Sequence, residues 1–315
     1  MQALKLNIEV ENSWIDNYSN HQPHFVVKDQ TTEGLLINCD CFSWLSSLPD
    51  NSIDAIVTDP PYGVKEYQTD QIEKRNNGYG GIWRIPPSFD GSTRSPLPRF
   101  TALNKSERES LSVFFKYFGY LISKKLKPGG HVFLASNSFL SQLVFSSVIN
   151  DQLEFRTEII RIVRTLRGGD RPKNYENEFP DVCSLPRGCY EPWGLFRKKL
   201  LENMKVGDCL REYGTGALRR ISDIKPFEDV ITSNRTSREE KKISDHPSLK
   251  PQEFLRKIVY ASLPLGSGIV VDPFMGSGST ISAAMFLNYR SVGVEISKDY
   301  FDKAKLSVPL LKTIK

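Results

Sequence analysis

Short apolar runs alternate with segments of helical spacing along most of the chain, and this rhythm is its strongest constraint on the fold. The runs are short enough for buried strands, whereas the segments between them place apolar residues on one face of a helix. The expected strands are residues 34–38, 53–57, 131–135, 158–163, 269–271 and 291–295. The expected helices are residues 42–48, 106–126, 139–149, 254–263, 281–287 and a last one from residue 298. Strands that alternate with helices predict a doubly wound, mostly parallel α/β sheet.

The alternation is interrupted twice. Residues 63–105 contain many Gly, Pro, Ser and Arg residues, and a loop of this length in a compact domain is usually functional or mobile. Residues 166–245 mix Gly, Pro and Arg with scattered aromatics and are expected to form an irregular lobe inserted into the sheet domain. The two parts of that domain would then be residues 34–165 and 246–315, preceded by a loosely packed N-terminal arm at 1–33.

Composition and charge exclude several classes of protein. The net charge of +5 is compatible with a polyanionic partner but does not require one. No apolar run reaches the ~20 residues that cross a bilayer, and the first residues resemble no signal peptide. We therefore expect no membrane partner and a cytoplasmic location. The five cysteines, an odd number, are expected to be reduced thiols, and no metal site is predicted.

A glycine-containing turn lies between an expected strand and the helix after it. This turn, residues 272–280, reads Asp-Pro-Phe-Met-Gly-Ser-Gly-Ser-Thr. Glycines let the backbone approach a ligand, and the helix start offers free N–H groups. Glu295, at the end of the next strand, is placed to accept hydrogen bonds from a ribose diol. The turn and Glu295 together suit a nucleotide or the amino-acid end of S-adenosylmethionine. The turn without Glu295 could equally have a purely structural role.

The sharpest feature is the sequence Asp59-Pro60-Pro61-Tyr62, which follows a buried strand and so lies at the ligand-binding edge of the sheet. Its prolines stiffen the turn. An exocyclic base amine is a poor nucleophile, but the Asp59 carboxylate and the Pro60 carbonyl could accept its two N–H groups and orient it towards a methyl donor. Tyr62 would stack on a base extruded from the duplex. The pattern favours direct amino methylation without a covalent intermediate.

Together these motifs resemble the β-class amino DNA methyltransferases of restriction–modification systems. The catalytic motif (58–63) comes first, a variable lobe follows, and His246-Pro247-Ser248-Leu249-Lys250-Pro251 precedes the cofactor motif (271–280). The resemblance spans residues 34–165 and 246–315. It implies a seven-stranded S-adenosylmethionine-dependent methyltransferase sheet, with double-stranded DNA as substrate and residues 166–245 as the target-recognition region. It is also compatible with a cognate restriction endonuclease and with a homodimer.

The resemblance also assigns cofactor contacts residue by residue. Asp59 would lie near the methionine amino group, Lys250 over the methionine end, Asp40 near the adenine and Glu295 on the ribose. The remaining contacts would come from the glycine turn. They are Asp272, Phe274, Gly276, Ser277, Gly278, Ser279 and Thr280.

Four other functions compete with adenine N6 methylation. Within the family that the chain resembles, Asp at the first position of the motif, here Asp59, favours adenine N6 as the target. Family members with Ser at this position more often modify cytosine N4. Methylation of cytosine carbon 5 needs a nucleophilic Cys beside a Pro, and the chain has no Pro-Cys pair. Protein glutamine methyltransferases usually have Asn at the head and the cofactor motif first. A DNA-binding module that has lost catalysis remains the non-enzymatic alternative.

Overall fold

The computed structural model describes residues 14–21, 23–61, 88–89, 92–93, 103–163, 171–172, 174–246 and 249–314, and the fold is that of these residues. Its strands are β1 (His24–Lys28), β2 (Glu33–Asn38), β3 (Ile53–Thr58), β4 (Ser88–Phe89), β5 (Ser92–Thr93), β6 (Leu126–Ala135), β7 (Leu153–Ile162), β8 (Tyr190–Lys198), β9 (Val230–Thr232), β10 (Ile269–Asp272) and β11 (Arg290–Glu295). Its helices are a 3-10 turn (Trp14–Asn17), α1 (Cys41–Ser47), α3 (Lys105–Lys125), α4 (Ser141–Val148), α5 (Val206–Tyr213), α6 (Arg238–Ile243), α7 (Gln252–Ser262), α8 (Ser279–Phe286) and α9 (Lys298–Thr313).

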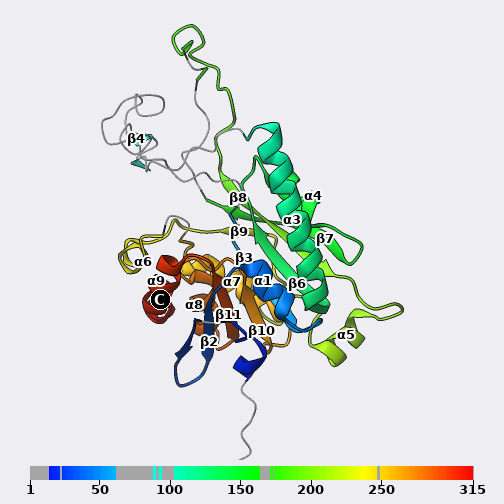
Figure 1. The fold of residues 1–315 in the computed structure, drawn as a ribbon. Helices are drawn as coiled ribbons and strands as arrows, with labels where there is room; N and C mark the ends of the chain where they lie inside the picture. Colours follow the sequence, from blue (N-terminus) through cyan, green and yellow to red (C-terminus); the bar gives the residue numbers. More distant parts are fainter. Residues whose placement is uncertain are drawn as a thin grey trace, which may run out of the picture.

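The main sheet has the strand order β1-β2-β11-β10-β3-β6-β8-β7-β9 (Figure 1). The five strands from β2 to β6 in this order run parallel, whereas β1 and β8 pair antiparallel with their neighbours. The predicted doubly wound, mostly parallel sheet is therefore confirmed. The predicted number of seven strands is wrong, because the sheet has nine.

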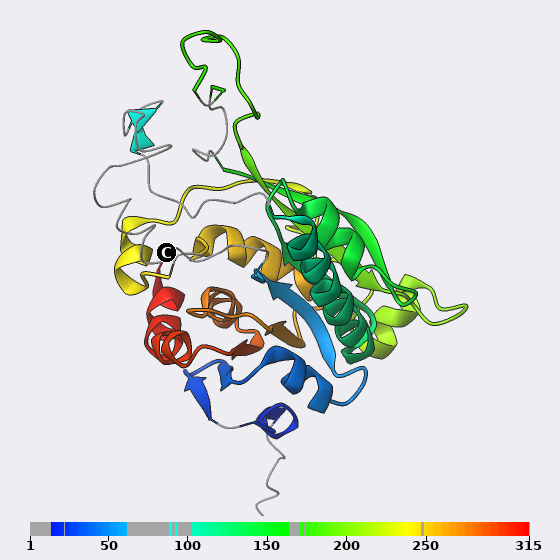
Figure 2. The ribbon, with the colours of Figure 1, turned by 45° about the horizontal axis from the view of Figure 1, so that its top comes forward.

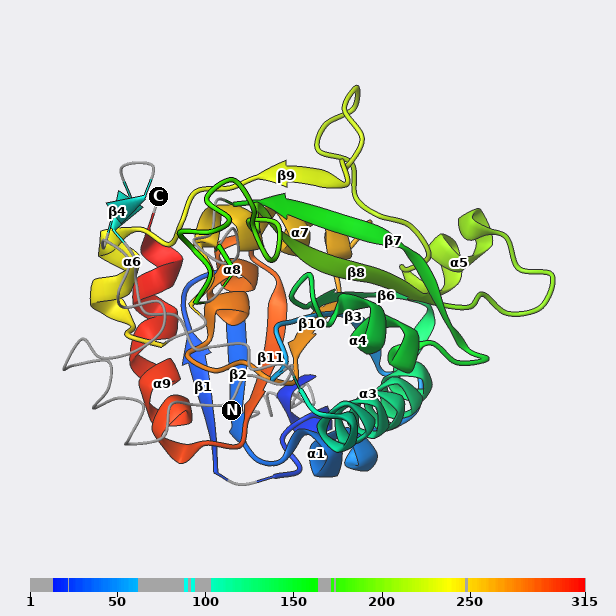
Figure 3. The ribbon, with the colours of Figure 1, turned by 90° about the horizontal axis from the view of Figure 1, so that it is seen from above.

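Helices cover both faces of the sheet. Helices α1, α3 and α4 contribute Trp44, Phe115 and Val144 to the core on one face. Helices α7 and α8 contribute Phe254 and Ala283 to the core on the other face, and α9 packs beside them. Figure 3 shows the two groups, with α3 and α4 on one side of the strands and α8 and α9 on the other. Among the described residues, no helix has the length and apolar character needed to cross a membrane.

The N-terminal segment is more tightly packed than a loose arm. Strand β1 pairs along its length with β2, and the side chains of Ile15, Tyr18 and Val27 are buried. The Tyr18 hydroxyl donates to the Ser52 carbonyl at 2.6 Å. The expectation of loose packing is therefore wrong for residues 14–33, apart from residue 22, which with residues 1–13 lies outside the described part. The apolar run Phe25-Val26-Val27 is only three residues long with polar residues on both sides, and no strand was predicted from it.

The region from 166 to 245 is only partly a separate lobe. Strand β8 lies inside the main sheet, between β6 and β7, and β9 pairs with β7 at the sheet edge. The apolar run of β8 is short because Pro192 precedes it and charged residues follow Phe196, so no strand was predicted there. In the structure, Trp193 of this strand is fully buried. The described residues between β7 and β8 extend away from the body, as the green segment in Figures 1 and 2 shows. Of the expected loop 63–105, only β4, β5 and residues 103–105 are described.

Candidate catalytic and cofactor site

The predicted catalytic and cofactor motifs meet at the centre of the sheet. Strands β3 and β10 are neighbours, and the chain winds from them in opposite directions, which makes their carboxyl ends the ligand-binding switch point. The Thr58 hydroxyl donates to Asp272 Oδ1 at 2.6 Å across this point. The two motifs, far apart in sequence, are therefore joined directly, as the order of strands requires.

Asp59 follows β3 at this edge and is paired with Lys250. The Lys250 ammonium lies 2.9 Å from Asp59 Oδ2 and 3.2 Å from Glu191 Oε2, so one cation joins two carboxylates. All three side chains are largely buried, which strengthens their electrostatic interaction. Lys250 occupies this position because it lies two residues before α7, which packs against β3 and lies beside it in Figure 2. Pro60 is buried and Pro61 is exposed, while Tyr62 lies outside the described residues.

Glu191 is a residue that the sequence did not single out. Besides Lys250, its carboxylate accepts hydrogen bonds from Trp193 Nε1 at 2.7 Å and from Arg161 at 3.3 Å. Burial alone would raise the pKa of Glu191, but the Lys250 and Arg161 cations, with the hydrogen bonds, hold it below its usual range. Glu191 is therefore an anion that anchors Lys250 beside Asp59. Its only signal in the sequence was a carboxylate next to an apolar aromatic stretch.

Arg161 extends this network towards β9. Its guanidinium donates to Ser233 Oγ at 3.2 Å and to the Asn234 carbonyl at 3.1 Å, and it lies 5.1 Å from the centre of the Phe254 ring. The Arg161 side chain is only 6% exposed, so its charge belongs to the buried network and not to the protein surface.

The glycine turn has the backbone shape that the sequence predicted. Gly276 and Gly278 both have positive φ angles, +52° and +84°. A Cβ atom at Gly276 would lie 2.9 Å from His246 Nε2, too close for an unstrained side chain. Glu295 Oε2 accepts a hydrogen bond from the Gly276 N–H at 2.9 Å, so the acidic residue and the turn are directly linked. Burial raises the pKa of Glu295.

The other predicted cofactor residues lie around this turn. Asp40 ends the loop after β2 and caps α1, accepting from the Ser43 N–H at 2.9 Å. Phe274 packs against Phe118 of α3, with ring centres 5.4 Å apart. Ser277, Ser279 and Thr280 are buried at the start of α8. The strand ends therefore bring the predicted cofactor residues to one edge, while their contacts with a cofactor stay a prediction.

Asp272 is the single carboxyl side chain of the turn, and its pKa is raised. Burial raises the pKa of Asp272 to about 6, and nearby Asp59 adds to the rise, while hydrogen bonds from Thr58, Thr280 and Phe274 oppose it. Asp272 is thus held by its neighbours rather than exposed to solvent. Its interactions fix the geometry of the turn relative to β3.

These residues fit S-adenosylmethionine. Asp59, Asp272 and Glu295 supply acceptors for an ammonium group and a ribose diol, and the left-handed Gly276 and Gly278 let the turn pack closely against His246 and Val308. The α8 amino terminus offers N–H groups to a carboxylate. Within the described residues, no group of His, Cys, Asp and Glu has the arrangement of a metal site.

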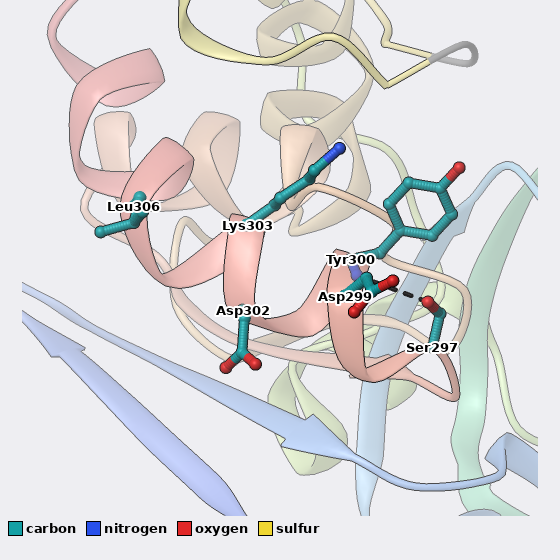
Figure 4. Close-up of a pocket in the computed structure, with 6 residues that line it drawn as sticks. All are labelled: Ser297, Asp299, Tyr300, Asp302, Lys303 and Leu306. Atoms are coloured by element: carbon teal, nitrogen blue, oxygen red, sulfur yellow. Dashed lines mark hydrogen bonds between the residues drawn. The ribbon is translucent and has the colours of Figure 1, made fainter.

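A separate hollow lies at the start of α9 (Figure 4). It is lined by Ser297, Asp299, Tyr300, Asp302, Lys303 and Leu306. Tyr300 and Lys303 point to one side of the helix and Asp302 to the other. The charges are used in surface ion pairs, such as Lys303 with Asp245 at 2.8 Å and Asp302 with Lys305 at 2.6 Å. This hollow adjoins the site through the ring contact between Tyr300 and His246.

Comparison with known proteins decides the family. The sequence profile of the N6/N4 DNA methylases matches residues 53–306. The chain belongs to this family. The type II methyltransferase M2.LlaDCHI of Lactococcus lactis subsp. cremoris is 33% identical over 274 residues, covering 86% of this chain and 87% of the relative. The expected restriction–modification family of DNA amino-methyltransferases is therefore confirmed.

Solved structures have the same fold as this DNA methylase. The protein TTHA0409 of Thermus thermophilus, complexed with S-adenosyl-L-methionine, is 18% identical with a TM-score of 0.54, over 88% of this chain and 95% of that one. The cytosine-N4-specific PvuII DNA methyltransferase is 14% identical with a TM-score of 0.55, over 90% and 86%. S-adenosylmethionine is the methyl donor of the family, which confirms the predicted cofactor.

Proposed function

We propose that this DNA methylase transfers a methyl group to adenine N6 at a specific site in duplex DNA. The observation that carries the proposal is the Asp59 carboxylate, fixed by Lys250 at the carboxyl end of β3. Among the β-class methyltransferases that the chain resembles, Asp at the first position of the motif favours adenine over cytosine. The cytosine-N4-specific PvuII structure shares the fold, so cytosine N4 is the second candidate.

The proposed mechanism depends on positioning. The target base is extruded from the duplex, and Tyr62 stacks on it. The Asp59 carboxylate and the Pro60 carbonyl accept hydrogen bonds from the exocyclic amine, which turns its lone pair towards the methyl donor. S-adenosylmethionine, when bound, supplies an electrophilic sulfonium methyl group. The amine loses one proton as it gains the methyl group, and Asp59 is the adjacent acceptor.

The proposed cofactor contacts are those predicted from the sequence. Gly276, Gly278 and Phe274 would line the cofactor, and Ser277, Ser279 and Thr280 would hold its carboxylate. Glu295 would bind the ribose, Asp40 would lie near the adenine, and Asp59, Lys250 and Asp272 would surround the methionine end. The direct hydrogen bond between Glu295 and the Gly276 N–H supports this assignment, because it links the proposed ribose acceptor to the turn.

The region 166–245 is the proposed target-recognition region. Its described part between β7 and β8 extends beyond the sheet and exposes Tyr175, Phe179 and Leu185, which suits contact with a large partner. Arg171 and Arg187 in the same segment supply positive charge for phosphates. The division of the chain at residues 33, 165 and 245, a homodimer and a partner endonuclease stay predictions.

Mass spectrometry of nucleosides tests the choice of base. DNA from cells that express the protein is digested to nucleosides, with DNA from cells expressing Asp59→Ala as the control. The proposal predicts N6-methyladenine that depends on Asp59. Finding N4-methylcytosine alone would replace adenine by the second candidate, and finding neither base would remove the proposed activity.

A further inference from the structure

Two buried polar side chains lie at the end of the strand next to the catalytic motif. Ser136 and Asn137 directly follow β6, the parallel neighbour of β3. Their side chains are almost fully buried, with 0% and 7% of each residue exposed. In the described part of the chain, Ser136 Oγ and Asn137 Nδ2 have no hydrogen-bond partner. Buried polar atoms without partners are rare and call for an explanation.

The strand register places these residues beside the catalytic motif. Thr58 lies opposite Leu134 in the parallel β3–β6 pair, so Pro60 is level with Ser136. On its other side, the Ser136 N–H bonds the carbonyl of Pro192, next to Glu191. The end of β6 therefore lies between the two carboxylates that Lys250 joins, Asp59 and Glu191.

The Asn137 amide has a defined orientation. Its Oδ1 accepts hydrogen bonds from the Phe139 N–H at 2.9 Å and the Leu140 N–H at 3.0 Å, which fixes the turn before α4. Because Oδ1 must be the acceptor, the unpartnered atom is the NH2 group, which carries two donors. The strand end thus carries buried hydrogen-bond donors at the level of Asp59 and Pro60, the two proposed acceptors.

We propose that Asn137 is a specificity-determining residue that donates a hydrogen bond to the ring nitrogen beside the methylated amine, with Ser136 supplying a second hydrogen bond to the base. This inference rests on the proposed function. Extruded bases are read through their Watson–Crick edge, where adenine has an acceptor, N1, next to its amino group. Acceptors for the amine and a donor for the adjacent ring nitrogen match adenine, and also cytosine, whose N3 acceptor lies beside its N4 amine. They reject guanine and thymine, whose edges carry the opposite pattern. An unpaired buried donor would disfavour such bases.

The test uses Asn137→Ser, which keeps an oxygen to accept from the turn N–H groups but lacks the NH2 group. Asn150→Ser is the matched control, because Asn150 Oδ1 accepts from the Gln152 and Leu153 N–H groups at 2.9 and 3.1 Å in the same kind of turn. Thermal unfolding and S-adenosylmethionine affinity of both variants are measured first. Both variants are expected to bind S-adenosylmethionine as the wild type does.

Methylation is then measured on the duplex site that the wild type modifies, with adenine or 1-deazaadenine as the target base. We expect kcat/KM of Asn137→Ser on adenine to fall about 10- to 100-fold, the effect of one lost donor to a buried acceptor. Asn150→Ser should stay within about twofold of the wild type, since it makes no contact with the base. Replacing adenine by 1-deazaadenine should lower kcat/KM of the wild type by a similar factor. It should lower kcat/KM of Asn137→Ser little further, because the variant has already lost the hydrogen bond that the analogue removes.

Three results would overturn the inference. Wild-type activity in Asn137→Ser would remove Asn137 from base recognition, and so would equal losses in Asn137→Ser and Asn150→Ser. If the fold-losses in kcat/KM from Asn137→Ser and from 1-deazaadenine multiplied when the two changes were combined, the two changes would act independently and Asn137 would not contact N1. Failure of the wild type to methylate any duplex would instead overturn the proposed function on which the inference rests.

Discussion

The Lys250 ammonium lies 2.9 Å from the Asp59 carboxylate, and this ion pair joins the segment before α7 to the catalytic motif after β3. Glu191 holds the same cation from the far side, at 3.2 Å. The carboxylate of Asp59 is therefore positioned by an alternating series of charges, Asp59, Lys250, Glu191 and Arg161, rather than by its loop alone. In the proposed mechanism, such positioning fixes the hydrogen-bond acceptor before the base arrives.

Glu191→Gln should lower both stability and methyl transfer. The substitution leaves Lys250 and Arg161 without a shared anion in a buried site, a change that typically costs ~3–5 kcal/mol of unfolding free energy. Lys250 would then depend on Asp59 alone, and we expect kcat to fall about tenfold or more as Asp59 loses its fixed position. Chemical unfolding and single-turnover methylation check the two effects.

Glu154→Gln is the control for this substitution. Glu154 pairs with Arg197 at 2.6 Å on the same sheet, but at the start of β7, away from the catalytic edge. Its loss should reduce stability and leave kcat unchanged. Equal kcat values for wild type and Glu191→Gln would show that Glu191 has no positioning role.

Gly276→Ala should weaken S-adenosylmethionine binding. The added Cβ would lie 2.9 Å from His246 Nε2, in a turn whose φ of +52° already disfavours a side chain. Gly214→Ala is the matched control, because Gly214 has a φ of +72° and its Cβ position meets only Leu265 Cδ1, at an ordinary contact distance of 4.0 Å. Both should lose ~1 kcal/mol of stability. Calorimetric titration should show a weaker S-adenosylmethionine affinity for Gly276→Ala only, and the same affinity in both would argue against the turn as the cofactor site.

The stability of the protein should fall in acid partly through His131. Burial lowers the pKa of His131 to about 3, and the charges of Arg197 and Arg156 add to the effect. Between about pH 6.5 and pH 3 the unfolded chain binds a proton at this residue and the folded protein does not, so lowering the pH favours unfolding. At pH 5 the loss from His131 is about 2 kcal/mol.

Urea unfolding at pH 7.5 and pH 5 tests this effect. The difference in unfolding free energy between the two pH values should be about 2 kcal/mol smaller for His131→Gln than for the wild type, because Gln does not titrate. Asp272 has the opposite effect on stability, because burial raises its pKa to about 6 and the folded protein gains the proton first as the pH falls. Asp272 is present in both proteins, so its effect cancels in the comparison. If the change in unfolding free energy between the two pH values were the same in both proteins, His131 would take up its proton as readily in the folded state as in the unfolded state.

Much of the sheet could be predicted from the sequence, because the central strands are fully buried and form short apolar runs. Val270 and Val271 of β10 and Ile56 and Val57 of β3 are examples. Strand β8 could not be predicted, because its apolar stretch is brief, follows Pro192 and pairs with strands distant in sequence. The N-terminal strand was missed for a similar reason, since only Val27 of its five residues is buried.

The site was predictable where motifs follow strands and unpredictable where it depends on tertiary contacts. The positions of Asp59, Gly276 and Glu295 could be predicted because parallel strands bring their carboxyl ends to one edge of the sheet. Glu191 and Arg161 lie on antiparallel strands, and their pairing depends on how β7 and β8 are added to the sheet. Likewise, the partner of Lys250 became visible only when α7 was placed beside β3.

The most direct test of the central claim is transfer of a labelled methyl group from S-adenosylmethionine to duplex DNA by the wild type and by Asp59→Ala. Binding of S-adenosylmethionine is measured in parallel, so that loss of cofactor affinity is separated from loss of chemistry. We predict label on DNA adenine with the wild type, and at least a hundredfold lower rate at saturating cofactor with Asp59→Ala, about the effect of removing a key hydrogen-bonding group in a preorganised site. Equal incorporation by the two proteins would contradict the assignment of Asp59 to the catalytic centre.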